Sequence, residues 1–233
     1  MHVRTIVNRI ISRYGYEITK IDKFKQYLIE EYNRDDDFCF IQIGANDGVS
    51  FDELYSFVTS RKCRGVVVEP LKIYFEKLKQ NYSRYPDIIP VNCAVHQNKK
   101  KAVLHYVDPA KLDLLPEWVQ GIGSLDPNHY KQSGLPSDYI VSEEVECVHL
   151  MELIRDNKFE HVNLLQIDVE GYDGEVIKMI DFDVIRPKMI KYEHQSLKKE
   201  EQQEITILLE SHGYEVFIHG NDSIAIDSSR TMS

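Results

Sequence analysis

The sequence predicts an α/β fold with a mostly parallel central sheet, one antiparallel strand, and helices on both faces of the sheet. Two observations lead to this prediction. Short apolar runs alternate with amphipathic segments along most of the 233 residues, and such alternation is typical of parallel strands joined by helices. Two further apolar runs, 215–218 and 223–226, close the chain as a hairpin, which adds one antiparallel strand to a mixed sheet.

Residues 1–35 are expected to form an amphipathic helical extension ahead of a single domain at 36–233. Val3, Ile6 and Ile10 follow helical spacing, whereas arginines occupy the other face. Two interpretations of this basic helix stay open. It can make a peripheral contact with an anionic membrane, or its apolar face can pack on its own domain or on a second subunit.

The other elements are assigned from apolar runs and from helix signals. A helix is expected to begin near Ser50 and Glu53, which have the capping-box spacing S-x-x-E. Leu71, Phe75 and Leu78 mark the apolar face of the next helix. Strands are expected at residues 38–43, 65–69, 88–92, 103–107, 145–148, 164–169 and 189–193, and later helices at 150–155, 174–180 and 205–209.

The segment from about 108 to 142 differs from the rest of the chain. It holds four prolines, three glycines and the only tryptophan, and its apolar residues follow neither a strand nor a helix period. A long aperiodic segment inside a compact domain is usually functional or disordered. We therefore expect a lid-like insertion over a ligand site.

Composition limits the class of partner. There are 28 Lys and Arg against 38 Asp and Glu, a formal net charge of -10, so a nucleic acid backbone is an unfavourable partner. No stretch approaches the ~18 to 20 apolar residues of a transmembrane helix. Cys39, Cys93 and Cys147 lie in or beside apolar runs without a C-x-x-C pair, so they are expected to be small buried residues rather than disulfides or metal ligands. This usage suits the reducing cytoplasm.

In folds of this class, ligands bind beyond the carboxyl ends of the parallel strands. The first strand is followed by Gly44, Ala45, Asn46, Asp47 and Gly48. Two glycines allow a tight turn and a close approach of ligand to backbone. The pattern is not the dinucleotide fingerprint G-x-G-x-x-G, because Asn46 stands where the second glycine should be. A turn without a ligand remains the alternative.

The second and third strands end in residues that suit a nucleoside. Glu69 closes the second strand, and a carboxylate at this position can accept both ribose hydroxyls of an adenosine-type cofactor. Pro70 follows at a position suited to the first turn of a helix. The third strand runs into Asn92, Cys93, Ala94 and Val95, which are small or apolar enough to flank an adenine. The alternative for Glu69 is a solvent-exposed residue at a helix start.

Two carboxylates, Asp168 and Glu170, close a buried strand just before Gly171 and the next helix. Burying carboxylates at a strand end is costly unless they have partners. The alternative is that both cap the following helix, whose dipole favours acidic residues at its start. Glu193 and His194 end the next strand on the same side of the predicted sheet.

Taken together, these motifs resemble the FkbM-type family of S-adenosylmethionine-dependent methyltransferases. The family pattern G-A-N-x-G matches residues 44–48, a strand ending in E-P matches 69–70, and I-D-x-E-G matches 167–171. A small S-L element matches Ser124-Leu125, and a later R-P followed by a strand ending in E matches Arg186-Pro187 and Glu193. The resemblance covers about residues 38–226. One departure is His149-Leu150-Met151 where the family often has T-L-D.

The resemblance implies a class I methyltransferase fold with a Rossmann-like sheet and S-adenosyl-L-methionine as cofactor. It further implies methylation of a hydroxyl on a sugar, glycolipid or other small natural product. The residues expected to bind the cofactor are Gly44, Ala45, Asn46, Asp47, Gly48, Glu69, Pro70, Asn92, Ala94, Val95 and Asp168. Two alternatives remain: an NAD-dependent oxidoreductase, whose ribose Glu69 would serve equally well, and a non-catalytic ligand-binding module, because fold alone never proves activity.

A hydroxyl acceptor must lose a proton, which requires a general base or a metal. Asp168, Glu170 and His194 are therefore the expected catalytic residues, with His194 as the group that titrates nearest neutral pH. A divalent metal is left open, and an oxygen-ligated Mg²⁺ at Asp168, Glu170 and Glu193 is the alternative to the base. The residues expected to contact the acceptor are Trp118, Ser124, His129 and Glu193.

Overall fold

The fold was analysed in a computed structural model, which describes residues 22–50 and 52–230. The chain divides into two compact units, Met1–Asp36 and Asp37–Ser233. In the first unit, helix α2 (Lys23–Arg34) is capped by Asp22, whose side chain accepts a hydrogen bond from the Lys25 backbone N–H. The predicted amphipathic face with Val3, Ile6 and Ile10, and its contact with a membrane or subunit, lie outside the described residues.

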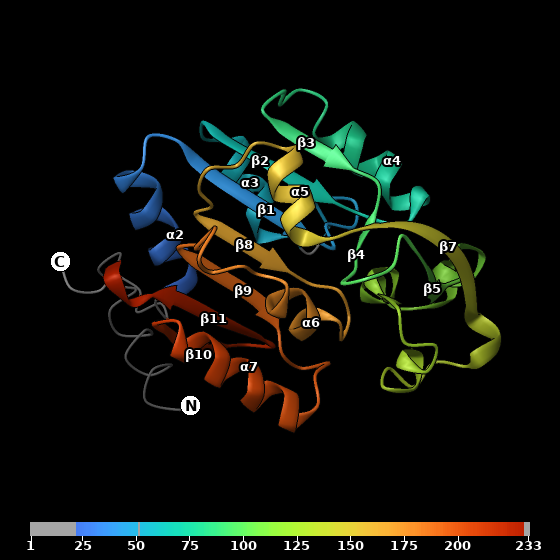
Figure 1. The fold of residues 1–233 in the computed structure, drawn as a ribbon. Helices are drawn as coiled ribbons and strands as arrows, with labels where there is room; N and C mark the ends of the chain where they lie inside the picture. The colour runs from blue at the N-terminus through green and yellow to red at the C-terminus, as the bar shows by residue number, and fades with distance from the viewer. Residues whose placement is uncertain (1–21, 51, 231–233) are drawn as a thin grey trace, which may run out of the picture. The chain divides into compact units, whose positions relative to one another are not determined.

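The second unit is built on a seven-stranded sheet in the order β10-β11-β9-β8-β1-β2-β3 (Figure 1). Its strands are β1 (Phe38–Ile43), β2 (Cys63–Val68), β3 (Ile88–Val91), β8 (Leu164–Ile167), β9 (Met189–Glu193), β10 (Tyr214–His219) and β11 (Asp222–Asp227). Strand β11 runs antiparallel to both of its neighbours, and the other pairs in this sheet are parallel. The predicted mostly parallel sheet with one antiparallel strand is confirmed.

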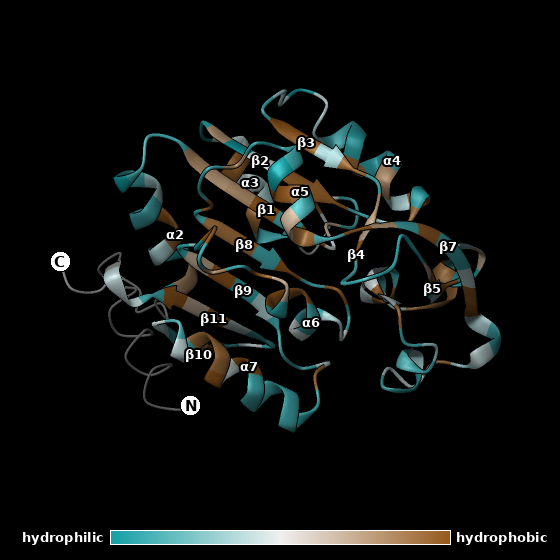
Figure 2. Cartoon of the chain, in the orientation of Figure 1, coloured by the Kyte–Doolittle hydropathy of each residue, from teal (hydrophilic) through white to brown (hydrophobic). Residues whose placement is uncertain are grey.

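Helices cover both faces of this sheet because successive strand residues point to opposite sides. Ile41 of β1 belongs to one buried cluster with Leu153, Val176 and Leu209, which come from three different helices. Phe38 points to the other side, where its ring lies 5.6 Å from that of Phe57. The helices are α3 (Glu53–Thr59), α4 (Lys72–Asn81), α5 (Leu150–Asp156), α6 (Asp173–Lys178) and α7 (Lys199–Ser211). Figure 2 shows the strands as largely apolar and the loops that join them as largely polar.

A smaller sheet, ordered β4-β7-β5-β6, lies beside the carboxyl end of the main sheet. Its strands are β4 (Ala94–Val95), β5 (Lys101–Val107), β6 (Gly123–Ser124) and β7 (Ile140–Val148). The predicted insertion falls between β5 and β7. It consists of β6 and the 3₁₀ helices η2 (Pro109–Leu114), η3 (Glu117–Gly121), η4 (His129–Lys131) and η5 (Ser137–Tyr139). Val107, Val119 and Ile122 give it a small apolar core, and its mobility as a lid stays a prediction.

Three local predictions are wrong. Helix α3 is capped by Asp52, whose side chain accepts from the Leu54 N–H, and not by Ser50. Ser50 instead donates both its backbone N–H and its hydroxyl to Asp47, because that carboxylate closes the preceding turn. At α4, Leu78 and the N-cap Leu71 are buried as predicted, but Phe75 is half-buried and Tyr74 is buried instead. The fourth core strand also stops at Ile167, two residues earlier than expected.

The strand registers align the chemistry at the carboxyl edge. Ile43 pairs with Val68 on one side and with Ile167 on the other, and Ile167 pairs with Tyr192. The residues that directly follow these positions therefore form one row across four strands. The row reads Glu69, Gly44, Asp168 and Glu193.

Candidate active site

A pocket opens at this row, with about 610 Å³ of empty space when its open mouth is included. Clefts at the carboxyl edge of such a sheet are the usual ligand sites. The polar part of its wall comes from Gly44, Asn46, Glu69, Asp168 and Glu170. The apolar part comes mainly from Val68, Leu71, Tyr74, Cys93, Ala94, Val95, Leu104 and Leu125.

The loop after β1 approaches the end of β8 so closely that only glycine fits at position 44. Gly44 has φ +79°, and a Cβ atom there would lie 1.7 Å from the Asp168 carbonyl oxygen. Asn46 also has a left-handed backbone, with φ +49°, a conformation that asparagine tolerates better than most residues. Its backbone N–H donates to Glu69, and its side-chain amide donates to the Gln120 carbonyl of the insertion. Asn46 thus joins three parts of the pocket wall.

Glu69 is 5% exposed, and both its carboxylate oxygens accept backbone hydrogen bonds of 2.9 Å, from Asn46 and from Leu71. Burial disfavours the charged form and raises the pKa of Glu69 to about 7, although the two N–H donors act in the opposite direction. Each carboxylate oxygen can accept more than one hydrogen bond. The Glu69 carboxylate can therefore still accept hydrogen bonds from the hydroxyl groups of a ligand in the pocket.

Some of the predicted cofactor residues shape the pocket without lining it. A Cβ at Gly48 would lie 2.5 Å from Leu78 and 2.7 Å from Tyr82, so this glycine is needed for packing against those side chains. Asp47 closes the turn described above. The Asn92 amide donates to the backbone carbonyls of Glu69 and Pro70, and the Ala45 N–H donates to Val68. The predicted cofactor residues that do line the pocket are Gly44, Asn46, Glu69, Pro70, Ala94, Val95 and Asp168.

Asp168 and Glu170 both line the pocket, but the expected extended strand is not the reason. Glu170 has φ +52°, so the chain has left the strand and turned before the carboxylate. The Asp168 side chain is open to the pocket yet enclosed by protein. The loss of bulk water, followed by the charges of Glu170, Asp173 and Glu193, raises the pKa of Asp168 well above its ordinary value.

The imidazole that contacts this carboxylate pair is His129, and not His194. The Nε2–H of His129 donates to Glu170 Oε2 over 2.8 Å, and the His129 side chain is almost fully buried. The hydrogen bond to Glu170 raises the pKa of His129. His194 instead pairs its Nδ1 with the Ser223 hydroxyl at 3.2 Å. Among the described residues, no hydrogen bond or ion pair joins His194 to Asp168 or Glu170, and its role as the base stays a prediction.

The other predicted acceptor residues take different positions. The Ser124 hydroxyl donates to the Glu170 carbonyl at 2.8 Å and accepts from the Asp126 N–H, so it fixes the turn that carries Glu170. Trp118 is 51% exposed and lies outside the pocket lining. The neighbouring Val119 is the residue of η3 that enters the core of the insertion.

The sequence analysis missed Asp173, which has no exposed surface. Its two oxygens accept from the Gly171 and Glu193 backbone N–H groups at 3.3 and 3.2 Å, and burial raises its pKa to about 8. Asp173 thereby ties the turn after β8 to the end of β9. One signal for Asp173 is visible in the sequence, namely a third acid two residues after Gly171. Tyr74, Leu104 and Tyr172 also line the pocket and were not predicted from the sequence.

A magnesium site at Asp168, Glu170 and Glu193 stays a prediction. Within residues 22–50 and 52–230, the three do not form a group whose ligand atoms all lie within 4.8 Å of one another. Glu193 Oε2 is buried and has no hydrogen-bond partner among the described residues. Burial and the charge of Glu170 raise the pKa of Glu193 to about 6.

The later R-P motif is structural. The Arg186 guanidinium pairs with the buried Asp227 of β11 and donates to the His212 carbonyl. The Pro187 carbonyl accepts from the Tyr214 hydroxyl of β10 at 2.7 Å. The motif therefore fastens the closing hairpin to the sheet.

Comparisons with known proteins place the chain in a family. The sequence profile of the methyltransferase FkbM domain matches residues 42–216. A comparison with curated protein sequences gave no match. Among solved structures, a methyltransferase FkbM from Methylobacillus flagellatus is 14% identical with a TM-score of 0.51, over 82% of this chain and 44% of that chain.

Two further structures are similar at lower scores. The fibrillarin pre-rRNA processing protein of Methanococcus jannaschii is 14% identical, with a TM-score of 0.43 over 82% of this chain and 67% of that chain. The N-terminal domain of human METTL16, solved in complex with SAH, is 13% identical, with a TM-score of 0.46 over 97% and 81%. The profile match spans most of the chain and agrees with the pocket at the carboxyl edge of the sheet. The chain belongs to the FkbM methyltransferase family and is an S-adenosylmethionine-dependent methyltransferase.

Proposed function

We propose that this enzyme methylates a hydroxyl oxygen of a sugar, glycolipid or other small natural product. One observation carries the proposal most. The carboxylate of Glu170 lines the pocket beside Asp168 and is held by the buried imidazole of His129. These carboxylates can accept a hydrogen bond from a hydroxyl group and take its proton. Methyl transfer to an alcohol requires this loss of a proton.

The pocket suits the cofactor by its chemistry. The Glu69 carboxylate reaches the pocket and can accept ribose hydroxyls. Leu71, Tyr74 and Ala94 provide an apolar wall for an adenine. Asp168 and Glu170 give the opposite side an acidic character, which favours a cationic ligand. When bound, S-adenosylmethionine supplies a methyl group on a positively charged sulfonium.

We assign the proton to a carboxylate oxygen of Asp168. The loss of bulk water, and then the charges of the neighbouring carboxylates, raise its pKa, which makes its carboxylate a stronger base than an ordinary aspartate. The hydroxyl proton would move to Asp168 as the acceptor oxygen takes the methyl group, whose bond to the sulfonium would break with its electron pair leaving on the sulfur. Glu170 would accept a second hydrogen bond from the substrate that receives the methyl group. His129 and Ser124 act as positioning residues, because they hold the Glu170 side chain and backbone.

The insertion at 108–142 has the position of a lid. Gly121, Gly123 and Leu125 contribute to the pocket wall. The contact of Asn46 with Gln120 fastens this segment to the loop after β1. Closure of such a segment excludes water from the reacting groups. The segment from 108 to 142 is thus proposed to shield the methyl transfer.

The pocket favours a methyl donor over a dinucleotide. A bound pyrophosphate needs free backbone N–H groups at the start of the first helix. Here the helix after β1 is α3, which begins only at Glu53. The Asp52 carboxylate already accepts a hydrogen bond from the Leu54 N–H in its first turn. Asn46 also replaces the second glycine of the fingerprint. These features and the family assignment count against both the oxidoreductase and the non-catalytic module.

The charge and the cysteines support the remaining parts of the proposal. The net charge of -10 and the acidic pocket favour a neutral or cationic acceptor over a nucleic acid. In the described part of the chain the four cysteines form no disulfide, and Cys39, Cys63 and Cys93 are buried while Cys147 is half-buried. Free thiols suit the cytoplasm, which is the location we propose. Within the described residues, the helices are too short or too polar to cross a membrane.

The test measures transfer of a labelled methyl group to a panel of glycosides, glycolipids and small hydroxylated natural products. His129→Gln should lower kcat about tenfold, the equivalent of one hydrogen bond of ~1.4 kcal/mol, whereas His194→Gln should change it little. The matched pair decides which imidazole serves the site. Equal losses for the two variants would contradict the assignment of His129. Loss of turnover with EDTA and recovery with Mg²⁺ would transfer the role of base to a metal-bound water.

A further inference from the structure

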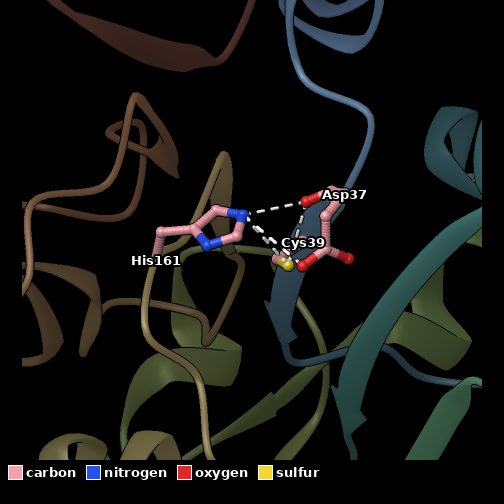
Figure 3. Close-up of side chains that lie close together, drawn as sticks. All are labelled: Asp37, Cys39 and His161. Atoms are coloured by element: carbon pink, nitrogen blue, oxygen red, sulfur yellow. Dashed lines mark hydrogen bonds and ion pairs between the residues drawn. The ribbon is translucent and has the colours of Figure 1, made fainter.

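The opposite end of the sheet holds a second group of chemically distinctive side chains. Asp37 directly precedes β1, Cys39 lies within it, and His161 lies three residues before the first residue of the neighbouring strand β8. Figure 3 shows the His161 imidazole directed toward both other residues. Each of the three side chains has one potential ligand atom within 4.8 Å of those of the other two. Within the described part of the chain, these three residues therefore form a group that could hold a metal ion.

The distances are those of a metal site. His161 Nε2 lies 3.4 Å from Cys39 Sγ and 3.9 Å from Asp37 Oδ2. Around a tetrahedral Zn²⁺, with bonds of ~2.3 Å to sulfur and ~2.0 to 2.1 Å to nitrogen or oxygen, these separations would be about 3.5 and 3.4 Å. The Asp37 backbone carbonyl also lies 2.8 Å from Nε2 and 3.2 Å from Sγ. The Cys39 sulfur and a carboxylate oxygen of Asp37 lie within 4.8 Å, so an ion would be centred by the three side chains moving closer together.

The backbone around Cys39 is already fixed. The Cys39 N–H donates to the Asn163 side-chain oxygen at 2.8 Å, and the Cys39 carbonyl accepts from the Asn163 N–H at 2.8 Å. These two bonds lock β1 to the segment that carries His161. A site whose ligands are held in advance loses less conformational entropy when it binds an ion.

Arg64 adds a second layer to the group. It pairs with Cys39 in the β1–β2 register, and its guanidinium donates to both carboxylate oxygens of Asp37 at 3.0 to 3.2 Å. Carboxylates that ligate metals are commonly held by such outer hydrogen bonds. Its charge favours the ionised carboxylate that an ion would need.

We propose that Asp37, Cys39 and His161 bind a structural Zn²⁺ that joins the amino ends of β1 and β8. One sulfur, one imidazole nitrogen and one carboxylate oxygen form a donor set that suits Zn²⁺ better than Mg²⁺ or Ca²⁺. On binding, the Cys39 thiol proton leaves for solvent or buffer, and His161 binds as the neutral imidazole with its proton on Nδ1, so that the Nε2 lone pair faces the ion. Cys39 is fully buried and Asp37 is exposed, so the ion enters from the Asp37 side, where water or the Asp37 carbonyl supplies the fourth ligand.

The test titrates the full chain, first treated with a chelator, with Co²⁺ and then with Zn²⁺. We expect one equivalent of Co²⁺ to produce a thiolate-to-cobalt charge-transfer band, and Zn²⁺ to displace it and raise the unfolding temperature. Cys39→Ser should remove the band, whereas Cys147→Ser, a thiol outside the group, should keep it. Absence of the band in the wild type at saturating Co²⁺, or its persistence in Cys39→Ser, would overturn the proposal.

A second variant protects the test against misfolding of the buried Cys39→Ser change. His161→Gln should weaken Zn²⁺ binding at least tenfold, because one of three protein ligands is lost. His105→Gln is the matched control, since His105 is also half-buried and has one side-chain hydrogen bond, to Ser142. Equal Zn²⁺ affinity in wild type and His161→Gln would count decisively against the site.

Discussion

The two ends of strands β1 and β8 carry different chemistry on the same framework. At the carboxyl end, Gly44 and Asp168 meet in a pocket that the carboxylates of Glu69, Asp168 and Glu170 line. At the amino end, Cys39 and His161 bring sulfur and nitrogen together with an exposed Asp37. One register determines both groups, because pairing Phe40 with Leu164 also fixes the neighbours at either end.

The two ends shift the pKa of their carboxylates in opposite directions. The pocket raises the pKa of Glu69 and Asp168, mainly by removing water, so its carboxylates can accept protons or bind a cationic ligand. The amino end instead lowers the pKa of Asp37, mainly through hydrogen bonds from Arg64. A parallel sheet can therefore hold a reactive centre at one end and a rigid, ion-stabilised clamp at the other.

The largest expected effect is a loss of catalytic rate at the carboxyl end of the sheet. Asp168→Asn keeps the size of the side chain but removes its ability to accept a proton. It should lower kcat by ~10²-fold or more, while cofactor affinity changes much less. Turnover of labelled S-adenosylmethionine checks this, with the exposed Asp156→Asn as control. A near-normal kcat in a folded Asp168→Asn protein would move the base elsewhere, and Glu193 would be the next carboxylate to test.

The next effect concerns pH. Glu69 has a pKa of about 7 in the free protein, above its ordinary value of 4.5, so it is protonated below about 7. A cofactor whose hydroxyls bind the ionised carboxylate must displace that proton. The affinity for S-adenosylhomocysteine should therefore fall about tenfold per pH unit below about 7 and be constant above it. Calorimetric titrations from about pH 5.5 to 8.5 measure this, and Glu69→Gln should flatten the profile. A flat wild-type profile would refute the assignment.

The smallest expected effect tests whether the two ends are independent. Cys39 and Gly44 are five residues apart on one strand, about 16 Å, and sites so far apart usually behave additively. Cys39→Ser should therefore abolish the response to Zn²⁺ but leave kcat of the folded enzyme unchanged. A parallel loss of kcat at a temperature well below unfolding would show that the amino end also controls the pocket.

The sequence predicted the carboxyl end well because its signals are local. A buried apolar run marks each strand, and the residue after it marks the edge of the sheet, which placed Gly44, Glu69 and Asp168 correctly at one pocket. The same reasoning placed Asn92 and Gly48 at the pocket, although neither residue lines it. Being next to a strand end does not decide whether a side chain faces the ligand or holds the neighbouring loop.

Two partners had no local signal. His129 belongs to a segment of 3₁₀ turns, which are too short to produce a period, and it reaches Glu170 across 41 positions of the chain. His161 lies 122 positions from Cys39, so no metal-binding spacing connects them. Only the register of β1 with β8 brings the second pair together. The left-handed turn at Glu170 was equally hidden, because it depends on the contact with the insertion.

The most direct test of the account is calorimetric binding of S-adenosylhomocysteine to the wild type, Glu69→Ala and Glu76→Ala. Glu76 is an exposed acid on α4 and serves as the matched control. We predict one site in the wild type, unchanged affinity in Glu76→Ala, and a loss of ~1 to 3 kcal/mol, or about 5- to 150-fold, in Glu69→Ala. Equal affinity in all three proteins would show that the cofactor does not bind in the pocket at the carboxyl end of the sheet as described.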